Sequence, residues 1–326
     1  MNIQFHLTNA CNLRCKHCYQ GEYNPETISL LDFKNILKKT KVFFDSIGDP
    51  VYAINITGGE PMCVPDIGQY LLEADNYCKR IGLLSNGLLL TEKVLNELKK
   101  AKHFDRVQVS LEGPEDVNDM IRGAGTYKKI KQSILYIKNS GLRATVSCTI
   151  APYNYNRIIE LYDDLAKNEK PDILWFDRCI PFKGTDVLTK EQFRQFIVNL
   201  GILCKKSNEE GLFTKPLANR AMQWLAGDTG EPRYVCGAGL KHFTIMHNGD
   251  VMLCRRLNFS VGNLLKENWS DILAKALPIM KEMRKLPDEC RKCDFNNSCC
   301  GGLKCLTYSL YKDFNHKDVN CYLEEH

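Results

Sequence analysis

The stretch TNACNLRCKHCYQ, residues 8–20, follows a short apolar segment and contains three cysteines within eight positions. Cys11, Cys15 and Cys18 have the spacing C-x3-C-x2-C. Three thiolates on one loop suit three corners of a 4Fe–4S cluster and leave the fourth iron without a protein ligand. A zinc ion would need a fourth protein ligand, and His17 lies too close in the chain to serve comfortably. The spacing therefore favours an iron–sulfur cluster with one open iron.

The composition is that of a soluble globular protein. The 326 residues are 44% hydrophobic and 25% charged, and the formal net charge is +5. Basic residues are interspersed with acidic ones, so we expect neither a nucleic acid nor a membrane as partner. The first residues lack the basic and apolar regions of a signal peptide, and no apolar run is long enough to cross a bilayer. We therefore expect a cytoplasmic protein.

Sixteen cysteines are unusual for such a protein. Cytosolic thiols stay reduced, so metal binding explains them better than disulfides do. Beyond the opening motif, eight of them cluster late in the chain: Cys236, Cys254, Cys290, Cys293, Cys299, Cys300, Cys305 and Cys321. This crowding predicts further metal centres in the carboxyl-terminal part.

The first two thirds of the chain alternate strand and helix patterns. We expect strands at 2–8, 51–57, 81–87, 106–112, 143–150 and 172–178, and helices at 29–47, 65–80, 91–102, 126–141 and 154–168. Such alternation predicts an α/β fold with a parallel sheet. Functional residues gather at the carboxyl ends of parallel strands, where the cysteine motif and "GGEP", "SNG" and "SLEG" all fall.

The pattern changes after about residue 185. Residues 189–210 have helical periodicity, and from Cys236 onward glycine, cysteine and short turns dominate. A region this poor in apolar faces needs metal clusters to hold it together. We expect a barrel core at 1–185, a bridging helical segment at 186–235 and an auxiliary-cluster domain at 236–326.

The opening motif resembles the signature of the radical S-adenosylmethionine (SAM) superfamily, C-x3-C-x-aromatic-C. His17 takes the aromatic position, and "TGGEP" follows at the expected offset. The resemblance implies a partial (βα)6 TIM-like barrel, a SAM-binding 4Fe–4S cluster on the three cysteines, and hydrogen abstraction by a 5′-deoxyadenosyl radical under anaerobic conditions. The SAM contacts that it implies are His17, Thr57, Gly58, Gly59, Glu60, Asn86, Ser110, Glu112 and Arg122.

The later cysteines resemble the SPASM extension of peptide-modifying radical enzymes. The run C-x12-G-x4-C ends at Cys254, and "CRKCDFNNSCCGGLKC" and Cys321 follow. The resemblance implies two auxiliary 4Fe–4S clusters, one on Cys236, Cys254 and Cys305 and one on Cys290, Cys293, Cys299 and Cys321. The position given to Cys305 is also open to Cys300, and two zinc ribbons are the alternative for the whole region.

The resemblance implies modification of a peptide or protein residue, by a thioether or carbon–carbon cross-link or by epimerisation. Sulfatase maturases carry an acidic residue where this chain has Arg255, which cannot accept a proton at neutral pH. The alternative of formylglycine formation is therefore less well supported. A small-molecule radical SAM dehydrogenase and a non-catalytic peptide-binding or electron-transfer protein also stay open.

Two scattered cysteines lie near strand ends. Cys148 and Cys179 fall near the carboxyl ends of the fifth and sixth expected strands, and either thiol is a candidate hydrogen donor in an epimerisation. Ordinary core packing is the competing explanation, because free cysteine is among the most buried residues. We expect flavodoxin or ferredoxin as electron donor. A separate leader-binding protein is a further expected partner, because the cluster motif begins at Cys11 and leaves no room before it for a leader-binding domain.

Overall fold

The computed structural model describes residues 1–20, 23–182, 187–209, 215–218, 220–227 and 236–323. Its strands are β1 (Asn2–His6), β2 (Ala53–Thr57), β3 (Arg80–Ser85), β4 (Phe104–Ser110), β5 (Arg143–Ile150), β6 (Ile173–Arg178), β7 (Lys215–Ala218), β8 (His242–Ile245), β9 (Asp250–Met252) and β10 (Gly262–Asn263). Its helices are α1 (Leu30–Ser46), α2 (Ile67–Ala74), α3 (Glu92–Leu98), α4 (Glu115–Arg122), α5 (Thr126–Asn139), α6 (Ile158–Lys167), α7 (Lys190–Glu209), α8 (Arg220–Leu225), α9 (Trp269–Met283), α10 (Asn296–Cys299) and α11 (Lys304–Tyr311), with short 3-10 turns at Pro61–Cys63, Arg255–Leu257 and Asp288–Cys290.

All strands belong to one sheet in the order β10-β9-β8-β1-β2-β3-β4-β5-β6-β7. The run from β8 to β7 is parallel, and β9 and β10 continue it in antiparallel fashion. The six expected strands are present, and the α/β partial barrel is confirmed. Four strands were not expected. β7 lies within 186–235, where only helix was predicted, β8 returns from the cysteine-rich region to pair with β1, and β9 and β10 extend the sheet beyond β8.

The strands have one apolar and one polar face. On β1, Ile3 and Phe5 are fully buried toward the helices, whereas Asn2 and Gln4 point to the opposite side and line a cavity. Because strand side chains alternate in direction, the same division follows along β4, β5 and β6. The inside of the barrel is therefore open to a ligand.

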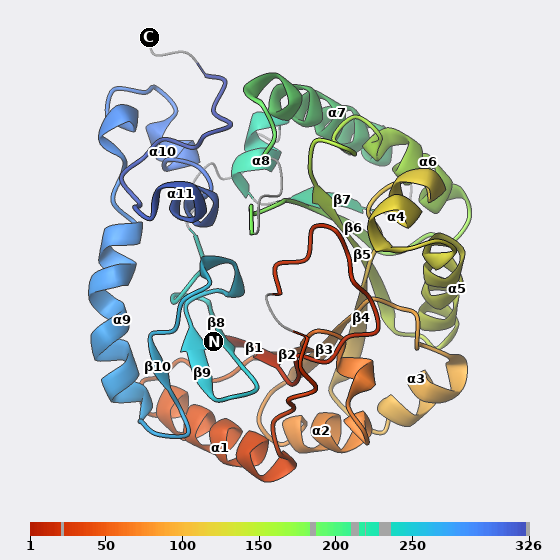
Figure 1. Cartoon of the computed structure of the whole chain (residues 1–326), viewed down its shortest axis with the longest axis vertical. Coiled ribbons are helices and arrows are strands. Elements are labelled where there is room, and N and C mark those ends of the chain that lie inside the picture. Colours follow the sequence, from red (N-terminus) through yellow and green to blue (C-terminus); the bar gives the residue numbers. More distant parts are fainter. Residues whose placement is uncertain (21–22, 183–186, 210–214, 219, 228–235, 324–326) are drawn as a thin grey trace.

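The helices of the first half surround the strands as an outer arc, and the loop after β1 crosses the middle of the barrel (Figure 1). Helix α1 begins where Ser29 accepts a hydrogen bond from the backbone N–H of Asp32, as the sequence indicates. Its Phe33 packs on Phe5 of β1 with ring centroids 4.7 Å apart. Among the described helices, none is both long enough and apolar enough to cross a membrane.

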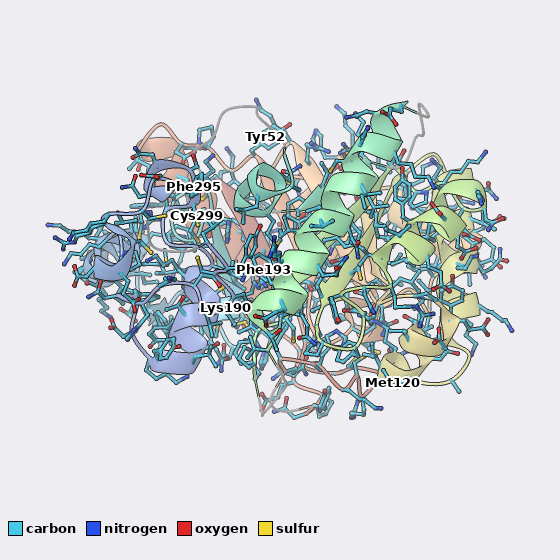
Figure 2. The ribbon with its side chains drawn as sticks, turned by 90° about the horizontal axis from the view of Figure 1, so that it is seen from above. Tyr52, Met120, Lys190, Phe193, Phe295 and Cys299 are labelled. Atoms are coloured by element: carbon cyan, nitrogen blue, oxygen red, sulfur yellow. The ribbon has the colours of Figure 1, made fainter. Side chains whose placement is uncertain are left out.

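The cysteine-rich region shares the core of the barrel. The Trp269 ring of α9 lies 5.0 Å from Phe44 of α1 and 5.1 Å from Phe243 of β8, and its Nε1 donates to Thr40. On the other side of the molecule the C-terminal segment contacts α7, where the Phe193 and Tyr322 rings are 6.0 Å apart. Figure 2 shows Phe193 on α7 beside the region that carries Cys299. The late segments thus complete the barrel and pack into its core.

Candidate functional site

One large cavity of about 1080 Å³ lies inside the barrel. Cys11, Cys15 and Cys18 line it from the loop after β1. This loop is held in shape by its own backbone: the Leu13 N–H lies 3.4 Å from Sγ of Cys11, and the Cys18 N–H donates to the carbonyl of Cys15 at 3.1 Å. Three free thiols on one short loop, all facing one cavity, form the donor set that a three-cysteine 4Fe–4S cluster requires.

The end of β2 forms the floor under this loop. The Gly59 N–H donates to the Thr8 carbonyl at 2.7 Å, and the Glu60 N–H donates to the Ala10 carbonyl at 2.8 Å. A Cβ atom at Gly58 would lie 2.7 Å from the oxygen of Thr8, closer than real Cβ atoms approach. The glycines are therefore needed to dock β2 against the cysteine loop, while Thr57, Gly58 and Gly59 still line the cavity.

Replacing Gly59 with Ala should disturb this docking. The new Cβ would lie 2.8 Å from the Asn9 oxygen and still closer to that of Ala10, and overpacking of this kind costs about 1–3 kcal/mol. Because about 1.4 kcal/mol is a factor of ten, we expect the Kd for SAM to rise about tenfold or more, measured by anaerobic calorimetry. Gly68→Ala on α2 is the control, since its Cβ would meet only Leu98 at 4.0 Å. Unchanged SAM binding by Gly59→Ala would contradict this interpretation.

Glu60 is fully buried, and burial raises the pKa of its carboxyl group. It accepts hydrogen bonds from the Ser85 hydroxyl at 2.8 Å and from the Asn86 backbone N–H at 2.6 Å, both at the end of β3. The Asn86 side chain in turn donates to Asn12 in the cysteine loop at 2.6 Å. Glu60 and Asn86 thus brace neighbouring strand ends and the loop, in addition to lining the cavity.

Glu112, Arg122 and His17 form a buried charged group. Both Nε and Nη2 of Arg122 bind Oε1 of Glu112, and Nε2 of His17 lies 3.3 Å from the same oxygen. Burial alone would raise the pKa of Glu112, but the charges of Arg122 and His17 outweigh it and lower the pKa to about 2. Nη1 of Arg122 lies 3.8 Å from Sγ of Cys15. Arg122 is therefore fixed beside the first cysteine motif.

The structure brings most of the expected SAM contacts to the wall of one cavity. These are His17, Thr57, Gly58, Gly59, Glu60, Asn86, Ser110 and Arg122. Glu112 differs, because it is fully buried behind Arg122 and does not line the cavity. Its contacts make it a positioning residue for Arg122 and His17.

The later cysteines form two sets. Cys236, Cys254 and Cys305 line the same cavity as the first motif. The pKa of the Cys305 thiol is raised to about 12, mainly by burial. The neighbouring thiols of Cys254 and Cys236 also raise this pKa, whereas the charge of Arg256 lowers it. Cys300 does not line the cavity, and its Sγ lies 3.7 Å from the Asn297 carbonyl. Of the two candidates, Cys305 is thus the one beside Cys236 and Cys254.

The second set lies outside this cavity, around α10 and the C-terminal segment, and consists of Cys290, Cys293, Cys299 and Cys321. Burial raises the pKa of Cys299 to about 12, and Asp318, Cys321 and Cys290 raise it further because they lie close to the thiol. The nearby thiol of Cys293 in turn contributes to the raised pKa of both Cys290 and Cys321. These four thiols are therefore neighbours, as a fully cysteine-ligated cluster requires.

Single zinc ions are the alternative for the late cysteines. Within the ranges that the structure describes, no three His, Cys, Asp or Glu side chains are arranged to hold one metal ion. A zinc ion holds all its ligands within about 2.0–2.3 Å of one point. A cubane instead binds each cysteine to a different iron, so its thiols stay further apart.

Several cavity residues were not assigned a contact from the sequence. Tyr19 follows Cys18, and the guanidinium of Arg255 lies 4.7 Å from the centre of its ring. Arg255 is only 7% exposed, so it is a buried cation and not part of a solvated turn. Its neighbour Arg256 forms an ion pair with Asp177 of β6 at 2.7 Å. The sequence signal for Arg255 and Arg256 was their position directly after Cys254, but only the fold shows which residues they contact.

The two candidate hydrogen donors differ in position. Cys179, directly after β6, is buried but lines the cavity. Cys148 on β5 is fully buried and does not line it, and its Sγ lies 3.8 Å from Nδ2 of Asn154. The structure therefore brings Cys179, and not Cys148, to the site.

Comparison with known proteins identifies two domains. Residues 5–165 match the radical SAM superfamily, and residues 236–294 match SPASM, an iron–sulfur cluster-binding domain. The chain is 24% identical to the AdoMet-dependent heme synthase of Oleidesulfovibrio alaskensis, over 94% of this chain and 83% of that protein. It is 25% identical to the subtilosin biosynthesis protein AlbA of Bacillus subtilis, over 98% of this chain and 70% of that protein.

A third relative, the mycofactocin maturase MftC of Mycobacterium ulcerans, is 26% identical over 98% of this chain and 87% of its own length. Among solved structures, SuiB of Streptococcus suis bound to S-adenosylmethionine has the same fold, with a TM-score of 0.77 and 19% identity, covering 99% of this chain and 77% of that one. SuiB has also been solved with its precursor peptide SuiA bound. The cysteine motifs, the cavity and these matches agree: the chain belongs to the radical SAM superfamily and carries a SPASM iron–sulfur domain.

Proposed function

We propose that this protein is a maturase that modifies a residue of a peptide or protein substrate by radical chemistry. The observation that carries the proposal is the single cavity lined by two cysteine triads, Cys11, Cys15 and Cys18 on one side and Cys236, Cys254 and Cys305 on the other. AlbA and MftC, named for peptide products or their maturation, support the same reaction class. A cavity between two redox centres suits a reaction in which a substrate radical is formed and then oxidised or quenched.

In this assignment, residues 1–185 form most of the barrel, 186–235 connect it to the rest of the chain and add β7 to its sheet, and 236–326 hold the auxiliary clusters and add β8. SAM and the reduced first cluster, when bound, supply a 5′-deoxyadenosyl radical. The chain's own residues position the reactants. The glycine-containing segment Thr57–Glu60 and the side chain of Arg122 line the cavity and would contact SAM.

Formylglycine formation is less well supported. The position after Cys254 is Arg255, a buried cation stacked on Tyr19, where the sulfatase maturases carry an acidic residue. A tetrapyrrole is the second candidate substrate, because one of the relatives with similar identity is named a heme synthase. The two candidates are distinguishable by direct assay.

The test uses full-length, anaerobically reconstituted protein with two sets of substrates. One set holds the peptides encoded by short reading frames beside the gene, with and without a candidate leader-binding protein, and the other is an iron porphyrin with propionate side chains. The electron donor is reduced flavodoxin or ferredoxin. We expect one peptide to lose the mass of two hydrogen atoms, or to take up one deuterium in D2O. Turnover of the porphyrin with unchanged peptides would overturn the proposal.

Cys179→Ala tests whether this thiol is the hydrogen donor of an epimerisation. Burial raises the pKa of Cys179 to about 11, so at neutral pH it is a protonated thiol that holds a hydrogen atom. After the thiol hydrogen is transferred to the substrate carbon, one electron and one proton from the reducing system restore the thiol. We expect Cys179→Ala to cleave SAM normally but to lose deuterium incorporation at least about tenfold. Cys148→Ala is the control, and unchanged incorporation in Cys179→Ala would remove this role.

A further inference from the structure

The first auxiliary set has three cysteines, whereas a cysteine-ligated 4Fe–4S cluster takes four protein ligands. Cys236, Cys254 and Cys305 share the cavity wall. Cys300, the additional cysteine nearby in sequence, does not reach it. The last iron of this cluster is therefore either open, as in the first cluster, or bound by a group other than these cysteines.

His242, the first residue of β8, lies between two of these cysteines. β8 pairs with β9 as far as Thr244 and Met252, and beyond this pair the segment that leads to Cys254 remains beside the start of β8. The Gly239 N–H confirms that the two segments stay together here, because it donates to the carbonyls of both His242 and Leu253.

The imidazole also lies against Gly237, the residue that follows the first cysteine of the set. A Cβ atom at Gly237, the residue directly after Cys236, would be 3.2 Å from Nδ1 of His242. The His242 side chain lines the cavity together with all three cysteines. Among the residues that the structure describes, no hydrogen bond or ion pair to its ring nitrogens is present. Its nitrogens are therefore available to a ligand.

Other donors near the set are already occupied or unsuitable. Asp177 is paired with Arg256, and Lys241 is a cation at neutral pH. Cys179 lines the cavity, but its thiol already faces the carbonyl of Ile180, with Sγ 3.7 Å from that oxygen. We propose that an imidazole nitrogen of His242 is the fourth ligand of the first auxiliary cluster.

Imidazole ligation has a definite consequence for the cluster. Replacing thiolate by neutral imidazole raises the reduction potential of an iron–sulfur centre, as in Rieske proteins. A cluster closed by His242 has no iron free to bind substrate directly, so its role in this cavity is to accept or supply an electron. This inference rests on the iron–sulfur assignment and not on the identity of the substrate.

The experiment uses the full chain with Cys11, Cys15 and Cys18 replaced by Ala, so that only the auxiliary clusters contribute signals. After anaerobic reconstitution and reduction, pulsed EPR is recorded on protein that contains 14N- or 15N-histidine. We expect a nitrogen coupling that changes with the isotope and disappears in both His242→Ala and His242→Cys. His103→Ala is the matched control, because His103 is paired with Asp75 away from the cavity.

The His242→Cys variant distinguishes loss of a cluster ligand from misfolding of the protein. It should keep about eight irons per chain, two cubanes, while the midpoint potential of one cluster becomes more negative. A nitrogen coupling that is absent from the parent protein, or that survives in His242→Ala, would overturn the proposal. Since neither readout needs a substrate, failure here is distinguishable from failure of the peptide assignment.

Discussion

Simultaneous replacement of Cys11, Cys15 and Cys18 by Ala should abolish reductive cleavage of SAM and lower the iron content from about twelve to about eight per chain. The three thiols face the cavity from one loop, and no other described cysteine lies on that loop. Anaerobic iron and sulfide analysis and a 5′-deoxyadenosine assay with dithionite measure both effects. The loss of cleavage should be complete, because the radical is generated only at this cluster.

Cys63→Ala is the matched control for this triple variant. Cys63 lies three residues after Glu60 but does not line the cavity, so it should keep both the iron and the cleavage activity. A fall from about four irons to none in the triple variant would mean that the carboxyl-terminal cysteines bind no clusters. Persistent SAM cleavage would contradict the assignment of the first motif.

Arg178→Leu should produce the largest loss of stability. Arg178, at the end of β6, forms two hydrogen bonds of 2.8 and 2.6 Å with the carboxylate of Asp318, and both side chains are buried. Burial alone would raise the pKa of Asp318, but Arg178 outweighs it and lowers that pKa. Removing the arginine leaves a buried charge without its partner, which costs about 3–5 kcal/mol.

The loss should extend to the second auxiliary cluster. Asp318 also accepts the backbone N–H groups of Leu303 and Asn320, and it lies close to Cys299 and Cys321. We expect the variant to lose about four irons and to unfold at a clearly lower denaturant concentration. Arg143→Leu is the control, because the Arg143–Asp105 pair is exposed and contributes about 1 kcal/mol or less. Equal stability of the two variants would show that the Arg178 pair does not anchor the C-terminal segment.

The sequence predicted those parts of the molecule that depend on local pattern. Ser29 caps α1 and Thr91 caps α3, and such caps are predictable because capping needs only a side chain and an amide three residues away. Residue type alone is not sufficient, because Thr126 is the first residue of α5 and Gly125 precedes it in a left-handed conformation. The cysteine sets were predictable because ligand spacing is also a local property.

What the sequence could not predict depends on residues far apart in the chain. β7 is only four residues long and includes Pro216, so it has no strand pattern and is recognisable only by its pairing with β6. The bracing of Arg122 by Glu112 and the stacking of Arg255 on Tyr19 likewise join separate strand ends. The structure also shows that Arg255 is buried. The sequence could not predict this, because charge pattern alone does not distinguish a buried cation from a solvated one.

The pairing of β1 with β8 has a consequence for protein synthesis. β1 has β2 on one side, but its other neighbour is residues 242–245, so that edge stays unpaired until most of the chain has been made. At about 5–20 residues per second, translating the intervening segment takes about 10–50 s. During this interval the cysteine loop next to β1 is attached to an incomplete barrel, with an exposed strand edge that favours aggregation. Slow or interrupted translation before β8 should therefore reduce the yield of folded protein even when every cluster ligand is intact.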